Sequence, residues 1–262
     1  MSILSANRRT APEIPSIEAA SDGLFIRIPR SVFSLNGFRQ WVLSDEFPEK
    51  LRVTYVDGEI YLDMSKEELQ THALAKAEVA RVLMNLNREL RLGQFYLDGV
   101  LVTNIAGGVS NNPDAVFIKW ETLEKGRAKF TPRRGKEGQF VEIEGSPDWV
   151  LEIVSDSSVK KDTKKLRSAY WRAGIFEYWL VDARGSEINF QILYWRKKGY
   201  LASPNRGDGN IRAFSNVTSG SYGKHRDWSC GNTPFRCGNF DVQRKAGAGM
   251  MSCSVPVEVH GD

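Results

Sequence analysis

One carboxylate inside an apolar run constrains the fold of this chain more than any other feature. Residues 149–154 read WVLEIV, and Glu152 is the charged residue among them. Because side chains alternate between the two faces of a strand, Glu152 shares a face with Val150 and Val154. A strand apolar on both faces is typical of the middle of a sheet that is covered on both sides. The other face carries Trp149, Leu151 and Ile153.

A carboxylate buried in such a strand needs a cation, a metal ion or a proton. Two interpretations are open. In the first, a neighbouring lysine or arginine, or the open end of the strand, satisfies Glu152, and its role is structural. In the second, Glu152 binds a metal ion in a functional site.

A second acidic residue, Asp114, has a similar setting. It follows Pro113 and leads into the apolar run 115–118. Proline is tolerated at the start of a strand and hardly elsewhere in a sheet, so Asp114 is expected at a strand entrance. Carboxylates on two adjacent strands would form a natural Mg²⁺ site, because this ion takes one or two carboxylates and keeps several waters.

Lysines close to Glu152 could complete a hydrolytic site. A bound metal acidifies a water molecule, and an ammonium orients that water or offsets developing charge. For most of these lysines a solvated helix face is the simpler interpretation. The candidates are Lys160, Lys161, Lys164 and Lys165.

The order of the remaining elements predicts an α/β fold with a mixed central sheet flanked by helices. A hairpin with a DG turn is expected at 52–64, and the basic segment 121–139 is expected to be a surface loop or a lengthened hairpin. Helices are expected at 34–44, at 65–92 and from 162 to Gly174. Further strands are expected at 24–29, 94–105, 114–120, 140–145, 149–154, 177–183 and 189–195, with a turn-rich connection at 107–113.

The long helix has the clearest signals. Ser65 and Glu68 are expected to form a capping box, and Gly93 is expected to end the helix. Its apolar face is expected to carry Leu69, Ala73, Ala77, Ala80, Leu83, Leu86 and Leu90.

Three segments are expected along the chain. Residues 1–22 are rich in polar and small residues and predict a flexible N-terminal arm. Residues 23–202 form one domain. Residues 203–262 are rich in Gly, Ser and Asn, have no helical or strand period, and predict an atypical, poorly ordered tail. A frameshift between about residues 203 and 220 is one hypothesis for its origin, and genuine divergence is the other.

Charge and hydropathy restrict the function classes. The formal net charge of +4 permits contact with a polyanion without demanding it. No apolar run has the length of a membrane span, and the first residues lack the apolar core of a signal peptide. A cytoplasmic protein without a membrane partner is therefore expected.

Several motifs resemble one family. PDAVF, SPDWVLEIVSDSSVKKDT and LRSAYWRAGIFEYWLVDA, with YVDGE and MSKEELQTH before them, resemble the Uma-two family of restriction-endonuclease-like proteins in the PD-(D/E)XK nuclease superfamily. The likeness covers roughly residues 24–202. The resemblance implies a restriction-endonuclease-like fold, with a mixed central sheet flanked by helices. It also implies hydrolysis of DNA phosphodiester bonds with Mg²⁺ or Mn²⁺. It matches Asp114 and Glu152 to the two acidic motif residues, which bind the metal and take part in catalysis.

The lysine of the superfamily pattern is missing at both expected positions. Val154 stands two residues after the acid, and Leu166 stands four residues before the matching tyrosine. Lys161, in KKDT, is the first candidate for the catalytic lysine, and Lys165 is the second. The departure leaves an alternative open: a catalytically inactive nucleic-acid-binding module, or a regulatory module from a mobile element, on the same fold.

Other residues have weaker signals. His72 matches the family's histidine, and Glu59 follows the DG turn, so both are accessory candidates near the metal or the phosphate, with a structural role as the alternative. Asp148 and Asp182 flank strands and are expected to anchor loops or caps. The aromatic residues of 170–179 are expected in the core.

The expected partner is DNA. Basic side chains attract the DNA backbone without reading its sequence. A homodimer is an open option beside a monomer. The basic residues expected to approach the backbone are Arg133, Arg134 and Lys136.

Overall fold

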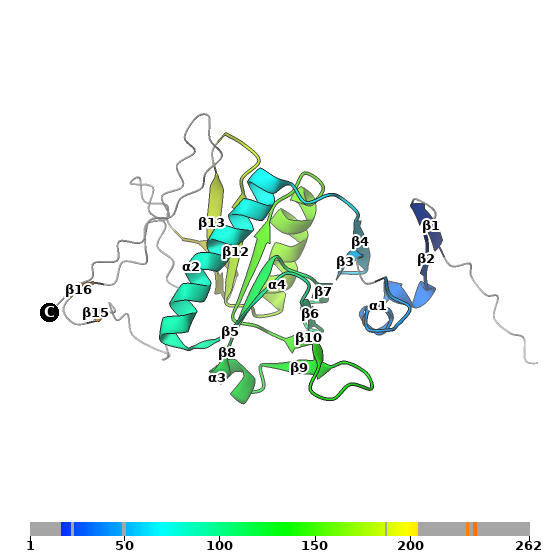
Figure 1. Ribbon diagram of the computed structural model, residues 1–262, viewed down its shortest axis with the longest axis horizontal. Helices are drawn as coiled ribbons and strands as arrows, with labels where there is room; N and C mark the ends of the chain where they lie inside the picture. Colours follow the sequence, from blue (N-terminus) through cyan, green and yellow to red (C-terminus); the bar gives the residue numbers. More distant parts are fainter. Residues whose placement is uncertain are drawn as a thin grey trace, which may run out of the picture.

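Two six-stranded mixed sheets form the body of the protein, and helices flank them (Figure 1). The computed structural model describes residues 17–21, 24–48, 51–186, 188–203, 229–230 and 233–234. The predicted α/β fold with a mixed sheet flanked by helices is confirmed. The second sheet is a feature that the sequence analysis did not anticipate.

The central sheet has the strand order β14-β13-β12-β11-β8-β5. β11 is an inner strand, parallel to β12 and antiparallel to β8, and all five of its residues are buried. This position confirms the interpretation of its apolar run. The strands are β5 (Gly93–Leu97), β8 (Ala115–Lys119), β11 (Trp149–Ile153), β12 (Glu177–Asp182), β13 (Asn189–Arg196) and β14 (Gly199–Ala202).

The second sheet has the order β4-β3-β7-β6-β10-β9, in which β6 and β10 are the parallel pair. The predicted segment 94–105 divides between the two sheets, and β7 occupies part of the segment expected as a turn. β9 and β10 form the lengthened hairpin that was one of two expectations. The strands are β3 (Arg52–Val56), β4 (Glu59–Asp63), β6 (Leu101–Asn104), β7 (Val109–Asn111), β9 (Ala128–Pro132) and β10 (Phe140–Gly145).

The β3–β4 hairpin turns at the predicted dipeptide. Asp57 and Gly58 have φ values of 51° and 82°, and two consecutive positive φ angles define the turn type that suits the twist of a two-residue hairpin. The hairpin places Tyr61 and Asp63 along the wall of the site described below.

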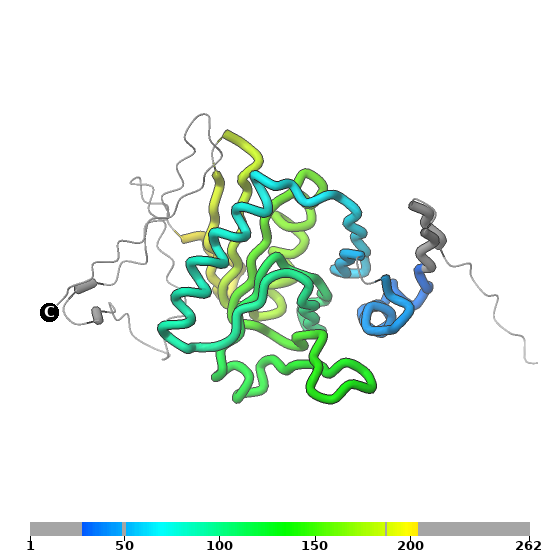
Figure 2. Tube along the Cα trace, in the orientation of Figure 1, coloured from blue at the N-terminus to red at the C-terminus, as the bar shows by residue number. Residues whose placement is uncertain are grey.

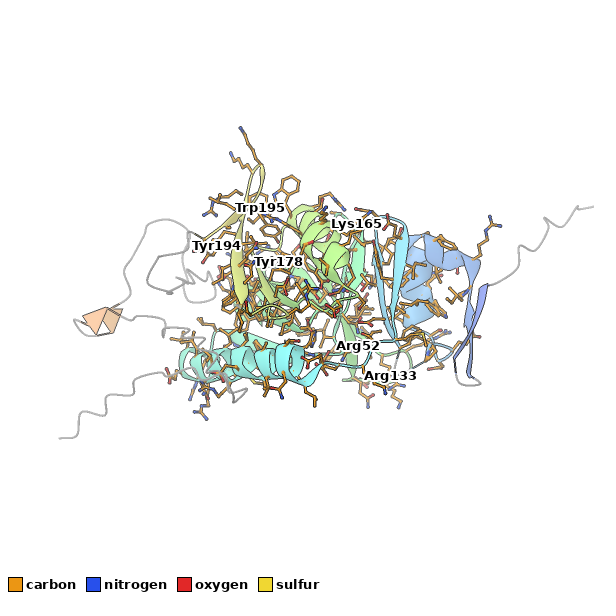
Figure 3. All side chains as sticks on the ribbon, turned by 90° about the horizontal axis from the view of Figure 1, so that it is seen from above. Arg52, Arg133, Lys165, Tyr178, Tyr194 and Trp195 are labelled. Carbon is orange, nitrogen blue, oxygen red and sulfur yellow. The ribbon has the colours of Figure 1, made fainter. Side chains whose placement is uncertain are left out.

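Helices lie on both faces of the central sheet, and the helical segment 30–42 packs instead against the second sheet. The helices are η1 (Arg30–Phe33), α1 (Leu35–Val42), η2 (Leu69–Ala73), α2 (Leu74–Leu90), α3 (Trp120–Glu124), η3 (Lys161–Leu166) and α4 (Arg167–Arg172), with η1 a 3₁₀ helix and η2 and η3 π-helical. Figures 1 and 3 show α2 and α4 on opposite faces. Figure 2 shows α1 and the β3–β4 hairpin at one end of the molecule and β13 and β14 towards the other.

The two faces of β11 enter two different apolar cores. Val150 and Val154 pack in one core with Tyr170 of α4. Leu151 packs in the other core with Val79 of α2. The predicted alternation along this strand is therefore confirmed, and Glu152 points to the α4 side.

The start of the long helix differs from the prediction. Helical structure begins at Leu69, and Glu68 is the residue before it, with a carboxylate that accepts a hydrogen bond from Thr71 N. Ser65 N and Oγ instead donate to Asp63 Oδ1, at 2.9 and 2.6 Å. The predicted capping box is wrong, because the Ser65 side chain is already engaged with the preceding strand.

The buried face of the helix is also shifted. His72 and Lys76 point inward, towards the edge of the central sheet. The buried face of the helix is therefore the face that carries these two residues. Leu69 and Leu90, expected on the apolar face, are exposed. The buried residues of α2 are Ala75, Lys76, Val79 and Ala80.

The end of the helix also differs. α2 ends at Leu90, and Arg91 follows in the left-handed conformation with φ 51°. Gly93 is the first residue of β5, where a Cβ atom would lie 2.0 Å from Ile118 O. This glycine therefore permits close approach of two backbones and does not end the helix.

Several predicted regions lie outside the described residues, among them 1–16 of the arm and almost all of the tail. β1 (Ile17–Ser21), which pairs with β2 (Leu24–Ile28), falls within the range 1–22 predicted as an arm. In the tail, β15 (Ser229–Cys230) pairs with β16 (Thr233–Pro234). None of the helices in the described ranges is long and apolar enough to cross a membrane.

Gly93→Ala should lower the free energy of unfolding by about 2 kcal/mol or more, because the β8 backbone must move away from the new methyl group. Gly174→Ala is the matched comparison. Gly174 has φ 70°, and no atom lies within 4 Å of the position that a Cβ atom would take. Gly174→Ala should therefore lower the free energy of unfolding by about 1 kcal/mol, from conformational strain alone. Urea unfolding of both variants measures the difference. Equal losses would contradict the packing role of Gly93.

Candidate active site

Two strands of the central sheet bring Asp114 and Glu152 to one place. The antiparallel pairing of β8 and β11 sets Ala115 opposite Leu151, so the start of one strand adjoins the end of the other. Asp114 N donates to Leu151 O at 3.0 Å, and Ile153 N donates to Asp114 Oδ2 at 2.7 Å. The predicted strand entrance is confirmed, and Asp114 is tied to the neighbouring strand by backbone and side chain.

Both carboxylates border a polar cavity of about 50 Å³ at this end of the central sheet. The β3–β4 hairpin and the end of β7 form the wall contributed by the second sheet, and the turn between β11 and η3 forms another part of the wall. The cavity is small and rich in hydrogen-bonding groups. Its other charged lining residues are Arg52, Asp63, His72, Lys161 and Asp162.

Glu152 is 3% exposed and is held through one of its two oxygens. Asn111 Nδ2 donates to Glu152 Oε1 at 2.8 Å, and Tyr170 OH donates to the same oxygen at 2.7 Å. Oε2 accepts no hydrogen bond from the residues that the structure describes. Burial raises the pKa of Glu152 well above its usual range, against the opposing charge of Lys161. A divalent cation beside Oε2 would compensate this buried carboxylate.

Asp114 is 7% exposed and lies next to a lysine and a histidine. Lys76 Nζ lies 3.2 Å from Asp114 Oδ1, and His72 Nε2 lies 3.5 Å from Oδ2. Burial opposes ionisation, but the interactions with His72 and Lys76 outweigh it and lower the pKa of Asp114 below its usual range. Asp114 is therefore ionised at neutral pH, whereas the pKa of Glu152 is shifted in the opposite direction.

The two candidate lysines occupy different environments. Lys161 borders the cavity, its side chain is 15% exposed, and its Nζ lies 2.9 Å from Asp162 Oδ1. Burial disfavours its charge, but Glu152 and Asp162 raise the pKa of Lys161 above its usual range, so it stays cationic. Lys165 Nζ instead lies 2.5 Å from Glu59 Oε1, and neither of these two residues borders the cavity.

Asp162 is a third buried carboxylate in the cavity wall. Its Oδ1 makes the ion pair with Lys161 but accepts no hydrogen bond from the described residues. Burial raises the pKa of Asp162, and the charge of Lys161 opposes this shift. The cavity lining has four carboxylates against the side chains of Arg52, Lys161 and His72, which leaves an excess of potential negative charge.

The other acidic candidates have the anchoring roles that were expected. Asp148 Oδ2 accepts from Lys119 N at 2.8 Å, and its Oδ1 accepts from Thr122 Oγ1 at 2.9 Å, which fixes the start of α3. Asp182 pairs with Arg184 at 2.9 Å. Of the Trp and Tyr side chains expected in the core, Tyr170, Tyr178 and Trp179 are buried, whereas Trp171 is only partly buried.

Basic side chains occur at the cavity wall and on an exposed connection at the far edge of the second sheet. Arg52 borders the cavity with a side chain that is partly exposed. The β9–β10 connection is exposed throughout and carries Arg133, Arg134 and Lys136. Figure 3 shows Arg52 and Arg133 on the same side of the molecule and Lys165 towards the opposite side.

Sequence reasoning missed several residues of this site, among them Asp162, Asn111 and Lys76. Asn111 lies in the segment expected as a turn, and its contact with Glu152 depends on the pairing of the second sheet. Lys76 carried one usable signal: it follows His72 by one helical turn, so the two share a face. The packing direction of that face was needed to place Lys76 beside Asp114.

The donor set fits a hard divalent cation with few protein ligands. Within the described ranges, no group of three or more His, Cys, Asp or Glu side chains has an arrangement that could hold a metal ion. Asp114 and Glu152 remain as a carboxylate pair, and Mg²⁺ is bound by one or two carboxylates together with water. The free Oε2 of the buried Glu152 supports this assignment.

Comparisons with known proteins identify the family. Residues 36–210 match the model of the Uma2 family, whose description is "Putative restriction endonuclease". The match spans more than half of the chain, and the protein belongs to this family. The crystal structure of "a putative nuclease belonging to DUF820 from Anabaena variabilis ATCC 29413" is similar, with a TM-score of 0.49, 19% identity, and coverage of 69% of this chain and 88% of that chain. A search of curated proteins found no match.

Tyr170→Phe should lower the free energy of unfolding by about 1 kcal/mol, because Glu152 Oε1 loses a buried hydrogen bond. The same substitution in a Glu152→Leu background should cost less, with a coupling of about 1 kcal/mol between the two sites. Chemical unfolding of the four proteins of this cycle measures the coupling. An equal cost in both backgrounds would show that Tyr170 does not hold Glu152.

Proposed function

We propose that this protein is a metal-dependent endonuclease that hydrolyses DNA phosphodiester bonds. The observation that carries the proposal is that Asp114 and Glu152, from adjacent strands, border one cavity with Lys161 in the same wall. Membership of a family described as restriction endonucleases supports the class of reaction.

Asp114 and Glu152 would hold Mg²⁺ or Mn²⁺. Such an ion, when bound, polarises a phosphate oxygen and acidifies a water molecule. Asn111 and Tyr170 hold Glu152 by Oε1, so Oε2 is the oxygen available to the ion. Backbone contact with β11 fixes Asp114.

Lys161 would offset the negative charge that develops on the phosphate. Its contact with the cavity favours it over Lys165, which pairs with Glu59 at the surface. His72 borders the cavity next to Asp114 and is proposed as an accessory residue that contacts the phosphate or the metal-bound water. Glu59 would take part only through a bridging water.

The DNA backbone would run from the cavity along the basic side of the molecule. Arg52 borders the cavity, and Arg133, Arg134 and Lys136 extend the positive charge along the exposed β9–β10 connection. Contacts of this kind give affinity that falls with salt and carries no sequence information.

A catalytically inactive DNA-binding or mobile-element regulatory module is the second candidate. Val154 and Leu166, the positions where the superfamily pattern expects lysine, are buried in the apolar core beside α4. That observation favours loss of cleavage on a retained fold. Cleavage assays on supercoiled, linear and branched DNA with Mg²⁺ or Mn²⁺ separate the two candidates. Only the nuclease should cut DNA, and only when the ion is present.

Other expectations stay predictions from the sequence. They are a cytoplasmic location, a homodimer as one option for the assembly, and the division into an arm (1–22), a domain (23–202) and a tail (203–262).

Glu152→Gln should abolish cleavage and leave the fold intact, because it removes a metal-binding charge at nearly constant volume. The thermal stability should change little or rise, since a buried carboxylate is costly without its cation. A nicking assay on supercoiled DNA and a thermal melt measure the two effects. Cleavage at the parent rate would exclude Glu152 as a metal ligand.

Lys161→Met should lower the turnover by about 100-fold or more, the range found when one electrostatic stabiliser is removed. Lys165→Met is the matched control and should be close to neutral, because its ammonium pairs with Glu59 outside the cavity. Single-turnover cleavage rates give the comparison. Small, equal effects from both variants would favour the inactive binding module.

A further inference from the structure

Lys76 lies behind Asp114 in a cage of three carboxylates. Its Nζ lies 2.7 Å from Glu67 Oε1, 2.9 Å from Asp98 Oδ2 and 3.2 Å from Asp114 Oδ1. The side chain is 8% exposed and does not border the cavity. Glu67 and Asp98 accept hydrogen bonds from this ammonium, and its contact with Asp114 is an ion pair. Lys76 is therefore an internal cation held in place behind Asp114.

The local helix geometry builds this arrangement. η2 is a π-helical turn, and such turns occur frequently at functional sites. It presents His72 inward, and Lys76 follows one turn later on the same face. Glu67 Oε1 contacts both of them, lying 3.0 Å from His72 Nδ1 and 2.7 Å from Lys76 Nζ. Glu67 thus fixes both side chains next to Asp114.

The contacts already made by the four carboxylate oxygens restrict where metal ions can bind, because an oxygen has two lone pairs and each contact occupies one of them. Asp114 Oδ1 faces Lys76, and Oδ2 accepts from Ile153 N. Glu152 Oε1 accepts two hydrogen bonds, which leaves Oε2. In two-metal hydrolytic sites the ions lie about 3.5–4 Å apart and act together on the reacting phosphate. On Asp114 Oδ1, the place of such a second ion is taken by the Lys76 ammonium.

We propose that the Lys76 ammonium is a built-in cation of this site, which replaces a second metal ion on Asp114, so that the site binds one divalent ion per chain. Lys76 is then a positioning residue that acts through Asp114 and does not touch the substrate. This inference rests on the proposed function, because it takes Asp114 and Glu152 as the metal ligands.

The number of bound ions is the first test and needs no variant at Lys76. The full chain is titrated with Mn²⁺, and free Mn²⁺ is measured by its electron paramagnetic resonance signal. The expected result is one ion per chain. Glu152→Gln should abolish this binding, which identifies the site that the ion occupies.

Substitution of Lys76 is the second test. Lys76→Met should tighten Mn²⁺ binding by about tenfold or more, because it removes a positive charge next to the ligand. Lys76→Arg keeps the charge and should keep the parent affinity. Lys119→Met is the matched control, since Lys119 is also buried and lies on β8, at the end opposite Asp114. The Mn²⁺ affinity of this variant should equal that of the parent. A purely structural lysine would not tighten metal binding when removed.

Thermal melts confirm that each variant is folded. If Lys76→Met does not fold, the double variant Lys76→Met/Asp98→Asn removes one carboxylate together with the ammonium, and it should bind Mn²⁺ more tightly than Asp98→Asn alone. Two ions on the parent, or unchanged or weaker binding after loss of Lys76, would overturn the inference and leave the proposed function standing. No Mn²⁺ binding by the parent would overturn both.

Discussion

The burial of Glu152 in an inner strand is the constraint on which the rest of the site depends. A carboxylate in that position costs several kcal/mol unless it is compensated. The compensation comes from outside the strand: an amide from β7, a phenol from α4 and an ammonium from η3. These contacts require the second sheet to abut the central one and α4 to cross the face of β11. The need to compensate the Glu152 carboxylate thus accounts for the approach of β7, α4 and η3 to the end of β11.

The cations are distributed unequally around the two carboxylates. Asp114 has Lys76 and His72 beside it and is ionised, whereas Glu152 has neutral donors on Oε1 and the more remote charge of Lys161. Val154 and Leu166 stand where the superfamily pattern expects lysine, and both belong to the apolar core that covers this face. These two positions therefore supply no cation to Glu152. The π-helical start of η3 is where the fold leaves room for a lysine near the cavity.

Local patterns predicted the parts of the fold that depend on neighbouring residues. The alternation along 149–154, the DG hairpin and the strand entrance at Asp114 need only strand geometry and turn chemistry, and the structure confirms them. The second sheet, the role of Asn111 and the cage around Lys76 depend on pairings between distant segments, which no local pattern encodes. The capping box failed for a similar reason, since Ser65 bonds to the end of β4.

The most direct test of this account is a crystal structure of the protein with Mn²⁺, in which anomalous scattering locates the ion. One peak is expected in the cavity, within bonding distance of Glu152 Oε2 and an oxygen of Asp114, with the Lys76 ammonium still on Asp114 Oδ1. A cavity without an anomalous peak, or an ion bound elsewhere while Glu152 pairs with Lys161, would contradict it.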